Sequence, residues 1–438
     1  MSVRLDAQSS FSRTTFHNTL AALVFVCLLF GGQAAVAQTF STLYNFTGGA
    51  DGGFPYAGVT LDPRGNLYGI ATLGGNTSCY YGGESGCGTV FKLSHVGGSW
   101  TFGLLYSFAG GDDGWQPYAA VTIGPDGTLY GTTYLGGGTG CQQEGCGTVF
   151  QLRPGANFCR SVLCPWTETQ IYQFTNGLDG GNPLAGVTFD ANGNMYGTTI
   201  RAENNQDFGS VYELSPSSHG WILTALYDFS DFDQAGSPQG GVLFDQHGNL
   251  WGTTYLGGAD DCLDPQEPEP CGVLFELTPS GSGWNYRTAY EFEASVGGGP
   301  TGTLINDQSG NLYGTLDENG ANGNGGVYQF NLSSGVRLLY GVSGNPEANY
   351  GPQGGVVMDQ AGNLYGVDPY NGAYNEGFVF KLSPSNGGWT STDLHDFTGG
   401  NDGAAPYCTL VVDANGNIYG TTAYGGTHNR GTVFEITP

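Results

Sequence analysis

Apolar and polar residues alternate in short segments along much of this chain, the pattern of strands with one buried face. One segment places large or apolar side chains at every second position: Trp100, Phe102, Leu104, Tyr106 and Phe108. A second segment does the same: Trp221, Leu223, Ala225, Tyr227 and Phe229. Related segments begin at Trp166, Trp284 and Trp389. We expect strict alternation in these strands, and we interpret the tryptophans as core packing rather than as a sugar-binding row.

A pentapeptide framed by glycines recurs seven times and gives the chain its period. Its copies are GNLYG at Gly65, Gly310 and Gly362, GTLYG at Gly127, GNMYG at Gly193, GNLWG at Gly248 and GNIYG at Gly416. Successive copies begin 52 to 66 residues apart, a length that suits a four-stranded propeller blade with loops of varying length. The repeat therefore predicts an all-β fold, a seven-bladed β-propeller of four-stranded blades.

Each repeat divides into four expected strands, which we name A to D from the propeller axis outward. In the first repeat, strand A covers 58–61, the pentapeptide forms strand B, GTVF at Gly88 begins strand C, and the alternating segment from Trp100 forms strand D. An Asp-x-x-Gly turn at 62–65 joins A to B, because Asp bonds to nearby backbone and Gly accepts a positive φ. We interpret these aspartates as turn residues rather than as calcium ligands.

The repeat begins and ends out of phase, which predicts how the ring closes. The mature chain opens at 39–46 with a D strand that lacks its A, B and C strands, and it finishes at 431–436 with a C strand that lacks its D strand. Pairing these two strands would remove an exposed sheet edge. We therefore expect the N-terminal strand to close the last blade.

Residues 1–37 have the features of a secretory signal peptide. Arg4 and Arg13 lie in a polar start, an apolar run covers 20–30, and an Ala-Val-Ala cleavage site ends the segment. The run is shorter than the roughly 20 apolar residues of a membrane span. We expect cleavage after this site, a single propeller domain over 38–438, no membrane span in the mature protein, and a secreted or periplasmic location.

The chain is strongly acidic, with a formal net charge of −27. Removing Arg4, Asp6 and Arg13 with the leader leaves 37 acidic and 9 basic residues, a mature net charge of −28. A field of that sign repels phosphate backbones and anionic membrane surfaces. We therefore exclude nucleic acid as a partner, and we expect a monomer.

Most of the nine cysteines that remain after the leader fall in short loops. Three pairs stand directly before a C strand: Cys79 and Cys87, Cys141 and Cys146, and Cys262 and Cys271. A fourth pair lies in a different loop: Cys159 and Cys164. This placement favours local disulfides formed in an oxidising compartment. A four-cysteine zinc site is disfavoured, because the sequence has no C-x2-C spacing and each pair has its own blade.

One cysteine, Cys408, is left over. The equivalent positions in the other repeats all carry small residues: Ala57, Ala119, Ala185, Gly240, Gly302 and Gly354. Close packing near the propeller axis is the simplest account of this column. We therefore expect Cys408 to be a buried free thiol rather than a nucleophile.

The repeated unit LYxF, GGxDGxxP, GVxxDxxGNLYGTT, GG and GTVFxLxP resembles the tandem repeat of choice-of-anchor GloVer-containing proteins, which are exported bacterial proteins. The match covers essentially all of 40–438, and the motif recurs seven times in order. The resemblance implies the fold and export, but it brings no reaction and no catalytic residues. No sorting or anchoring segment follows Pro438, which favours a released or periplasmic form.

The D-to-A and B-to-C loops share one face of the expected propeller, which we call the loop face. The A-to-B turns and C-to-D loops share the other, which we call the turn face. The loop face carries the variable loops, the cysteine pairs and the GGxDGxxP segments, and binding sites commonly lie on such loops. Its candidate ligand-binding residues are Asp51, Asp113, Asp179, Asp402, Tyr56, Tyr118, Tyr407, His428 and Arg430.

Carboxylates beside aromatic rings suit a neutral glycan, because a ring stacks on a sugar face and a carboxylate accepts bonds from hydroxyls. They would also suit calcium, although we expect no cofactor, and each Asp could instead cap its own loop. We expect a binding or scaffold module for an extracellular glycan or protein. The alternative is a propeller enzyme, a lyase or a glycan-active hydrolase, with its site on the loop face. His428 has no matched base or metal ligands nearby in the sequence, so we assign no catalytic residue.

Overall fold

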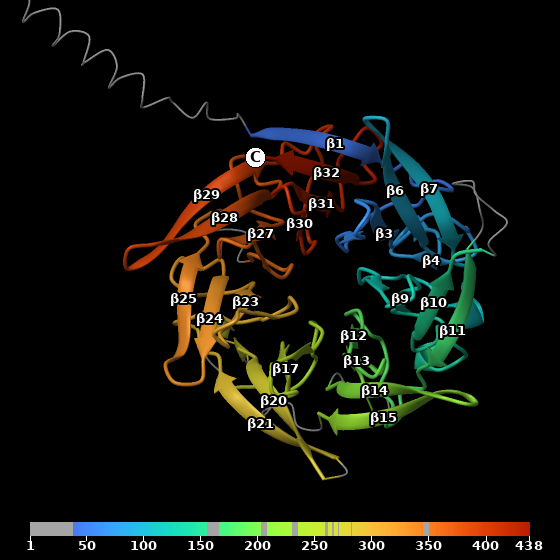
Figure 1. Ribbon diagram of the computed structural model, residues 1–438, viewed down its shortest axis with the longest axis horizontal. Coiled ribbons are helices and arrows are strands. Elements are labelled where there is room, and N and C mark those ends of the chain that lie inside the picture. Colours follow the sequence, from blue (N-terminus) through green and yellow to red (C-terminus); the bar gives the residue numbers. More distant parts are fainter. Residues whose placement is uncertain are drawn as a thin grey trace, which may run out of the picture. The chain divides into compact units, whose positions relative to one another are not determined.

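Seven four-stranded antiparallel sheets follow one another around a central axis in the computed structural model, as Figure 1 shows. The structure describes residues 38–155, 166–202, 208–229, 235–258, 262–264, 267–269, 271–281, 283–344 and 350–438. Residues Thr39–Thr437 form one compact unit, and this unit is the propeller. The seven-bladed fold that the repeat predicts is therefore confirmed. The predicted leader, 1–37, lies outside the described residues.

The two inner strand types are short. The A strands have two residues each: β2 (Thr60–Leu61), β8 (Thr122–Ile123), β12 (Thr188–Phe189), β16 (Leu243–Phe244), β22 (Ile305–Asn306), β26 (Val357–Met358) and β30 (Val411–Val412). The B strands have five: β3 (Leu67–Ala71), β9 (Leu129–Thr133), β13 (Met195–Thr199), β17 (Leu250–Thr254), β23 (Leu312–Leu316), β27 (Leu364–Asp368) and β31 (Ile418–Thr422). Every residue of every B strand is buried, so the core surrounds this layer.

The two outer strand types are longer. The C strands are β6 (Thr89–Val96), β10 (Thr148–Arg153), β14 (Ser210–Ser217), β20 (Val273–Ser280), β24 (Gly326–Asn331), β28 (Phe378–Ser385) and β32 (Thr432–Thr437). The D strands are β7 (Ser99–Ser107), β11 (Thr167–Gln173), β15 (Gly220–Asp228), β21 (Gly283–Glu291), β25 (Gly335–Gly341), β29 (Gly388–Asp396) and β1 (Thr39–Asn45). We number the blades 1 to 7 from the blade that contains β2.

A few short elements decorate the B-to-C and D-to-A loops. They are the hairpin of β4 (Tyr80–Tyr81) and β5 (Glu84–Ser85), the hairpin of β18 (Cys262–Asp264) and β19 (Glu267–Glu269), and the 3-10 turns η1 (Gly111–Asp113) and η2 (Cys141–Gln143). Across the described ranges, no helix has the length and apolar character that crossing a membrane requires.

The two glycines of the repeated pentapeptide are required for different structural reasons. Gly362 lies in the A-to-B turn with φ +81° and nothing near its missing side chain, so its backbone conformation selects glycine. Gly366 pairs with Phe380 on the neighbouring C strand, and a Cβ there would lie 2.4 Å from the ring. The second glycine therefore makes room for an aromatic ring. The same contact recurs in every blade, with Phe91, Phe150, Tyr212, Phe275, Tyr328, Phe380 and Phe434.

The aspartate of the A-to-B turn organises that turn, as expected. Asp359 accepts hydrogen bonds from the backbone of Ala361 and Asn363, both at 2.9 Å, from the Asn363 amide at 2.7 Å and from the Tyr365 hydroxyl at 2.9 Å. Burial alone would raise the pKa of Asp359, but these hydrogen bonds outweigh burial and lower it. One carboxylate thus accounts for the Asp, Asn and Tyr columns of the repeat.

The expected strict alternation of the D strands is wrong at one position per blade. The pairing of β6 with β7 shifts register between Val90 and Phe91, which face Tyr106 and Leu104 and leave Leu105 as the extra residue of a β-bulge. Leu105 is 6 % exposed, whereas Leu104, predicted to face the core, is 40 % exposed. The D strands of all seven blades carry this shift. Beyond the bulge, the alternating side chains therefore lie on the opposite face of the sheet from those before it.

The N-terminal strand closes the ring. β1 pairs antiparallel with β32, and the last sheet has the order β1-β32-β31-β30; Figure 1 shows the two strands side by side at the seam. Phe40 of β1 stacks on His395 of β29 in blade 6, with ring centroids 3.8 Å apart, and contacts Phe397 and Phe434. The predicted closure is confirmed. β1 completes blade 7, and its Phe40 also packs against blade 6.

Near the axis, the backbones of neighbouring blades approach so closely that only small side chains fit between them. A Cβ at Gly354 would lie 2.2 Å from the carbonyl oxygen of Cys408, and one at Gly302 would lie 2.5 Å from the backbone of Gly355. Cys408 itself is buried and free, as predicted. Burial raises the pKa of its thiol to about 11, and its sulfur accepts the backbone N–H of Thr421 at 3.3 Å.

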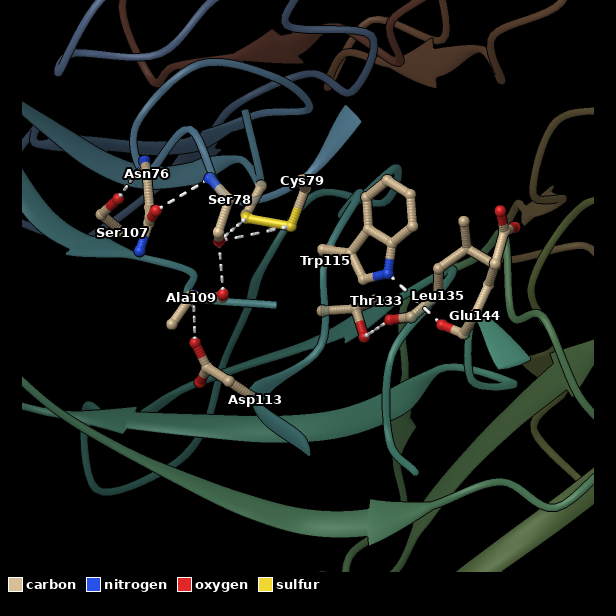
Figure 2. Close-up of a disulfide and its surroundings, with 11 residues drawn as sticks. Asn76, Ser78, Cys79, Ser107, Ala109, Asp113, Trp115, Thr133, Leu135 and Glu144 are labelled. Carbon is tan, nitrogen blue, oxygen red and sulfur yellow. Dashed lines mark hydrogen bonds between the residues drawn. A yellow bond between two sulfur atoms is a disulfide. The ribbon is translucent and has the colours of Figure 1, made fainter. Parts of the chain in front are cut away.

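Two of the four predicted disulfides lie fully within the described residues, and both are confirmed: Cys79–Cys87 and Cys141–Cys146. Cys271 is also disulfide-bonded, but the side chain of its predicted partner, Cys262, lies outside the described part. Cys159 and Cys164 lie outside it too. Figure 2 shows the first disulfide beside Ser78, whose hydroxyl donates to the carbonyl of Ala109 at 2.7 Å. The stapled loop is thereby fixed to the next D-to-A loop.

The D-strand tryptophans pack between blades, which supports the core interpretation. Four of the five approach the B-strand tyrosine of a neighbouring blade, with ring centroids 5.9 to 6.4 Å apart. The pairs are Trp100 with Tyr419, Trp166 with Tyr68, Trp284 with Tyr196 and Trp389 with Tyr313.

Candidate functional site

The four candidate aspartates of the loop face are bound by their own loops. Asp113 accepts the hydroxyl of Tyr106 at 2.8 Å and the backbone N–H of Ala109 at 2.5 Å; the second of these bonds is visible in Figure 2. Asp179 accepts the hydroxyl of Tyr172 at 3.1 Å and both the N–H and hydroxyl of Thr175. These contacts tie the start of each D-to-A loop to the outer strand.

Asp51 and Asp402 repeat this arrangement. Asp51 accepts the Tyr44 hydroxyl at 2.9 Å and two bonds from Thr47, and Asp402 contacts His395 Nε2 at 3.2 Å and accepts two bonds from Thr398. None of the four aspartates lines the axial cavity described below. The geometry favours their role as loop caps, one of the alternatives that the sequence leaves open.

The three candidate tyrosines come together at the axis. The ring of Tyr56 lies 5.7 Å from that of Tyr118 and 5.4 Å from that of Tyr407, centroid to centroid. Tyr56 and Tyr407 stand in the first and last blades of the sequence, and the closed ring makes them neighbours. All three follow the proline that precedes an A strand, so they lie where the D-to-A loops turn inward.

A cavity of about 580 Å³ opens on the axis beside these rings. Its rim is formed by the residue after that proline in each of the seven repeats: Tyr56, Tyr118, Leu184, Gln239, Thr301, Gln353 and Tyr407. Its wall is formed by the small A-strand column and by threonines such as Thr122 and Thr303. Among the described residues, no charged side chain lines this cavity, in a chain with a formal net charge of −27.

The rim does not follow the sevenfold repeat. Tyrosines occupy it in blades 7, 1 and 2, and uncharged hydrogen-bonding groups occupy it in blades 4, 5 and 6, where Thr301 donates to the Gln353 carbonyl at 2.8 Å. One half of the rim thus offers aromatic surface, and the other offers amide and hydroxyl groups. Such a pairing suits a ligand with both an apolar face and many hydroxyls.

Two further candidates lie away from the cavity. Arg430 Nη1 bonds to Glu84 Oε1 at 3.0 Å, and its guanidinium lies 4.8 Å from the ring centroid of Phe54. These contacts join the last B-to-C loop to the hairpin of β4 and β5 in blade 1. His428 is exposed on the same loop, with Nδ1 2.9 Å from the Thr427 hydroxyl. The structure therefore does not bring either residue to the tyrosines.

Several tyrosines that the sequence reasoning missed extend the aromatic rim. Tyr134 packs on Tyr118, Tyr370 packs on Tyr407, and Tyr350 packs on Tyr370. The hydroxyl of Tyr424 lies 2.8 Å from that of Tyr56. They follow B strands or precede A strands at positions where the repeats differ. An alignment of the seven repeats, searched for tyrosines at positions where other repeats carry different residues, could have found them.

Blades 5 and 6 also bury carboxylates where the repeat has threonine or an uncharged residue. Asp317 is 2 % exposed; the Gln353 amide donates to its Oδ2 at 3.3 Å, and its Oδ1 has no hydrogen-bond partner among the residues that the structure describes. Burial and the charge of Glu318 raise the pKa of Asp317 well above its usual value. Burial also raises the pKa of Asp368 to about 6, although bonds from Tyr370 and Asn371 oppose it. Through its bond to Gln353, Asp317 supports the polar half of the rim.

A second hollow, of about 760 Å³, lies between blades 1 and 2 on the turn face. Its lining includes Asp62, Arg64, Lys92, Asp126 and Trp166, so it is charged where the axial cavity is neutral. Over the described ranges, no three His, Cys, Asp or Glu side chains are grouped so that they could hold a metal ion.

The fold is shared with many solved proteins at low sequence identity. One is an ulvan lyase of a polysaccharide lyase family, with 10 % identity, a TM-score of 0.50, and coverage of 88 % of this chain and 94 % of that one. Another is a putative 6-phosphogluconolactonase from Bacteroides uniformis, with 15 % identity, a TM-score of 0.49 and coverage of 78 % and 86 %. A Dyadobacter fermentans protein of unknown function has 12 % identity, a TM-score of 0.46 and coverage of 92 % and 99 %. These likenesses concern the fold alone.

The repeat itself identifies the family. No curated protein matches the chain. The family model of the Gloeobacter/Verrucomicrobia repeat matches residues 77–262, 163–342 and 265–438, which together run through most of the propeller. This agrees with the resemblance seen in the repeated motif. The chain belongs to the Gloeobacter/Verrucomicrobia repeat family.

Proposed function

We propose that this propeller is an exported binding module whose ligand is a neutral glycan, held at the axial cavity of the loop face. The observation that carries the proposal is the meeting of Tyr56, Tyr118 and Tyr407 at the rim of a cavity that no described charged side chain lines. Tyrosine rings bury a sugar face while their hydroxyls stay available for hydrogen bonds. The acidic surface disfavours polyanionic ligands.

The polar half of the rim supplies the hydrogen bonds that such a ligand needs. The side-chain amide of Gln353 donates to Asp317 Oδ2 at 3.3 Å, and this bond holds the side chain at the rim. Gln239 and Thr301 add neutral donors and acceptors on neighbouring blades. A rim that is held before binding loses little conformational freedom when the ligand arrives.

Export is supported by the disulfides and by the leader-like segment. Cys79–Cys87 and Cys141–Cys146 are stable in oxidising compartments. Comparing the N-terminus of the protein recovered from the periplasm and from the medium tests cleavage after Ala37 and separates the periplasmic from the released form.

The test of function is a glycan array probed with and without calcium, which includes neutral glucans, mannans and xylans and uronate-containing polymers. We expect neutral glycans to bind. Tyr56→Ala or Tyr118→Ala should then weaken binding by on the order of 1 to 3 kcal/mol. The matched control is Tyr80→Ala, because Tyr80 is 71 % exposed and does not line the cavity. Loss of binding in the control, with both rim variants unaffected, would contradict the site.

An enzyme is the second candidate, and one observation favours it. Asp317 is a buried carboxyl with a raised pKa, and one of its oxygens has no partner within the described part of the chain; such a group can donate a proton at neutral pH. Incubating the bound glycan with the protein and measuring new reducing ends decides between the two. We expect none; new ends that disappear in Asp317→Asn would establish catalysis instead.

A further inference from the structure

The tyrosines of the loop face form a continuous row rather than a single cluster. Successive ring centroids are 5.4 to 5.9 Å apart in the order Tyr134, Tyr118, Tyr56, Tyr407, Tyr370, Tyr350. The row starts in blade 2, passes the axial cavity and ends in the loop that leads into blade 6. We call these six residues the tyrosine row.

The rings of the row are held in place. The hydroxyl of Tyr407 donates to that of Tyr370 at 3.3 Å, and the hydroxyl of Tyr56 lies 2.8 Å from that of Tyr424. Burial raises the pKa of Tyr56 and of Tyr407, so these hydroxyls stay protonated and the bonds persist at neutral and mildly alkaline pH. The far end remains open, since Tyr350 is 40 % exposed.

Blade packing does not require this row. A residue that the repeat needs for folding recurs in every blade, as the second pentapeptide glycine does. The rim position after the proline is instead Leu184, Gln239 and Thr301 in blades 3, 4 and 5. At this rim position tyrosines are therefore confined to blades 7, 1 and 2, because Gln353 occupies it in blade 6. Tyr370 and Tyr350, from other columns of the repeat, continue the row, whose members are neighbours in space although they are far apart in the sequence.

A small sugar could contact only one or two of these rings, whereas an extended chain could contact more of them. Each ring that a bound chain covers adds buried apolar surface, and rings held beforehand add it at little entropic cost. The row is also bordered by the uncharged rim of the cavity. The chemistry that fits this surface is a neutral polymer with repeated apolar faces and hydroxyl edges.

Resting on the proposed function, we infer that the ligand is an extended neutral polysaccharide that lies along the tyrosine row and crosses the mouth of the axial cavity. Tyr56, Tyr118 and Tyr407 form the central contacts, which any fragment would use. Tyr134 and Tyr350 form the end contacts, which only a long chain would reach.

The experiment is a calorimetric length series with neutral gluco-, manno- and xylo-oligosaccharides from disaccharide to octasaccharide. We expect affinity to rise with length before it levels off. Tyr134→Ala and Tyr350→Ala should weaken the longest oligomers by about tenfold, equivalent to roughly 1.4 kcal/mol, and leave the shortest binding oligomer unchanged. Tyr56→Ala should weaken every length, and Tyr80→Ala none. Circular dichroism and melting temperatures check that each variant folds.

Affinity that does not depend on length, with binding still lost in Tyr56→Ala, would overturn the row while leaving the proposed function intact. Equal losses for short and long oligomers in the two end variants would also overturn it. Absence of binding to every neutral oligomer and polymer would overturn both the row and the proposed function.

Discussion

At the residue scale, positions that recur in every blade satisfy local geometry, and positions that break the repeat gather around the axis. Gly366 recurs because the ring of Phe380 fills the space of a side chain, and Asp359 recurs because it fixes a turn. The rim residues Tyr56, Gln239 and Thr301 occupy one column of the repeat but differ in size and chemistry. We therefore assign the first kind of residue to folding, and we propose that the second kind binds the ligand.

Cys408 gives a prediction about reactivity and packing. Because its thiol is buried and its pKa is raised to about 11, we expect no modification by thiol reagents until the protein unfolds. Cys408→Ala should cost only about 1 kcal/mol of unfolding free energy, since alanine fills three equivalent positions and one weak hydrogen bond is lost. Cys408→Leu should cost more, because the neighbouring backbone leaves no room. Rapid labelling of the folded protein would contradict this account.

The sequence predicted some single residues well and others poorly, for physical reasons. The column of small residues identified Cys408 as buried, because close packing constrains every member of a column. Asp113 was a ligand candidate because the sequence does not reveal that Tyr106 and Ala109 already occupy its oxygens. Tyr370 was missed because its importance arises from Tyr407, which another blade supplies.

At the element scale, strand type and order followed from the repeat, but strand register did not. The alternating segment from Trp100 correctly predicted a D strand. The bulge at Leu105 was missed, because an extra residue leaves no mark in a run where both Leu104 and Leu105 are apolar. The closing strand β1 was predictable, since an unpaired C strand at one end requires a D strand from the other.

Removal of the closing strand tests the seam between the first and last residues of the ring. Deleting residues 38–47 exposes the edge of β32 and removes Phe40 from Phe397 and Phe434. We expect a lower melting temperature with a broadened transition, or aggregation through the open edge. Phe40→Ala is the milder variant and should cost about 2 kcal/mol of unfolding free energy, less than a core phenylalanine, because Phe40 is only partly buried. A deletion variant that melts like the parent would show that the clasp is dispensable.

At the scale of the whole molecule, the period and its phase predicted the ring, whereas the site depends on what the ring brings together. Tyr56 and Tyr407 become neighbours only because β1 closes the last blade onto the first. The sequence indicated the variable loops and cysteine pairs of the loop face, but not the axial cavity or the tyrosine row, because both arise from contacts between blades. Those contacts decide that aromatic and neutral groups, rather than the four loop aspartates, face the axis.

The most direct test of the central claim is a crystal structure of the protein with the neutral oligosaccharide that binds it most tightly. We predict sugar rings packed on Tyr56, Tyr118 and Tyr407, with hydroxyls bonded to the polar half of the rim that includes Gln353. Sugar bound instead on the turn face, for example in the charged hollow between blades 1 and 2, with the axial cavity empty, would contradict the account.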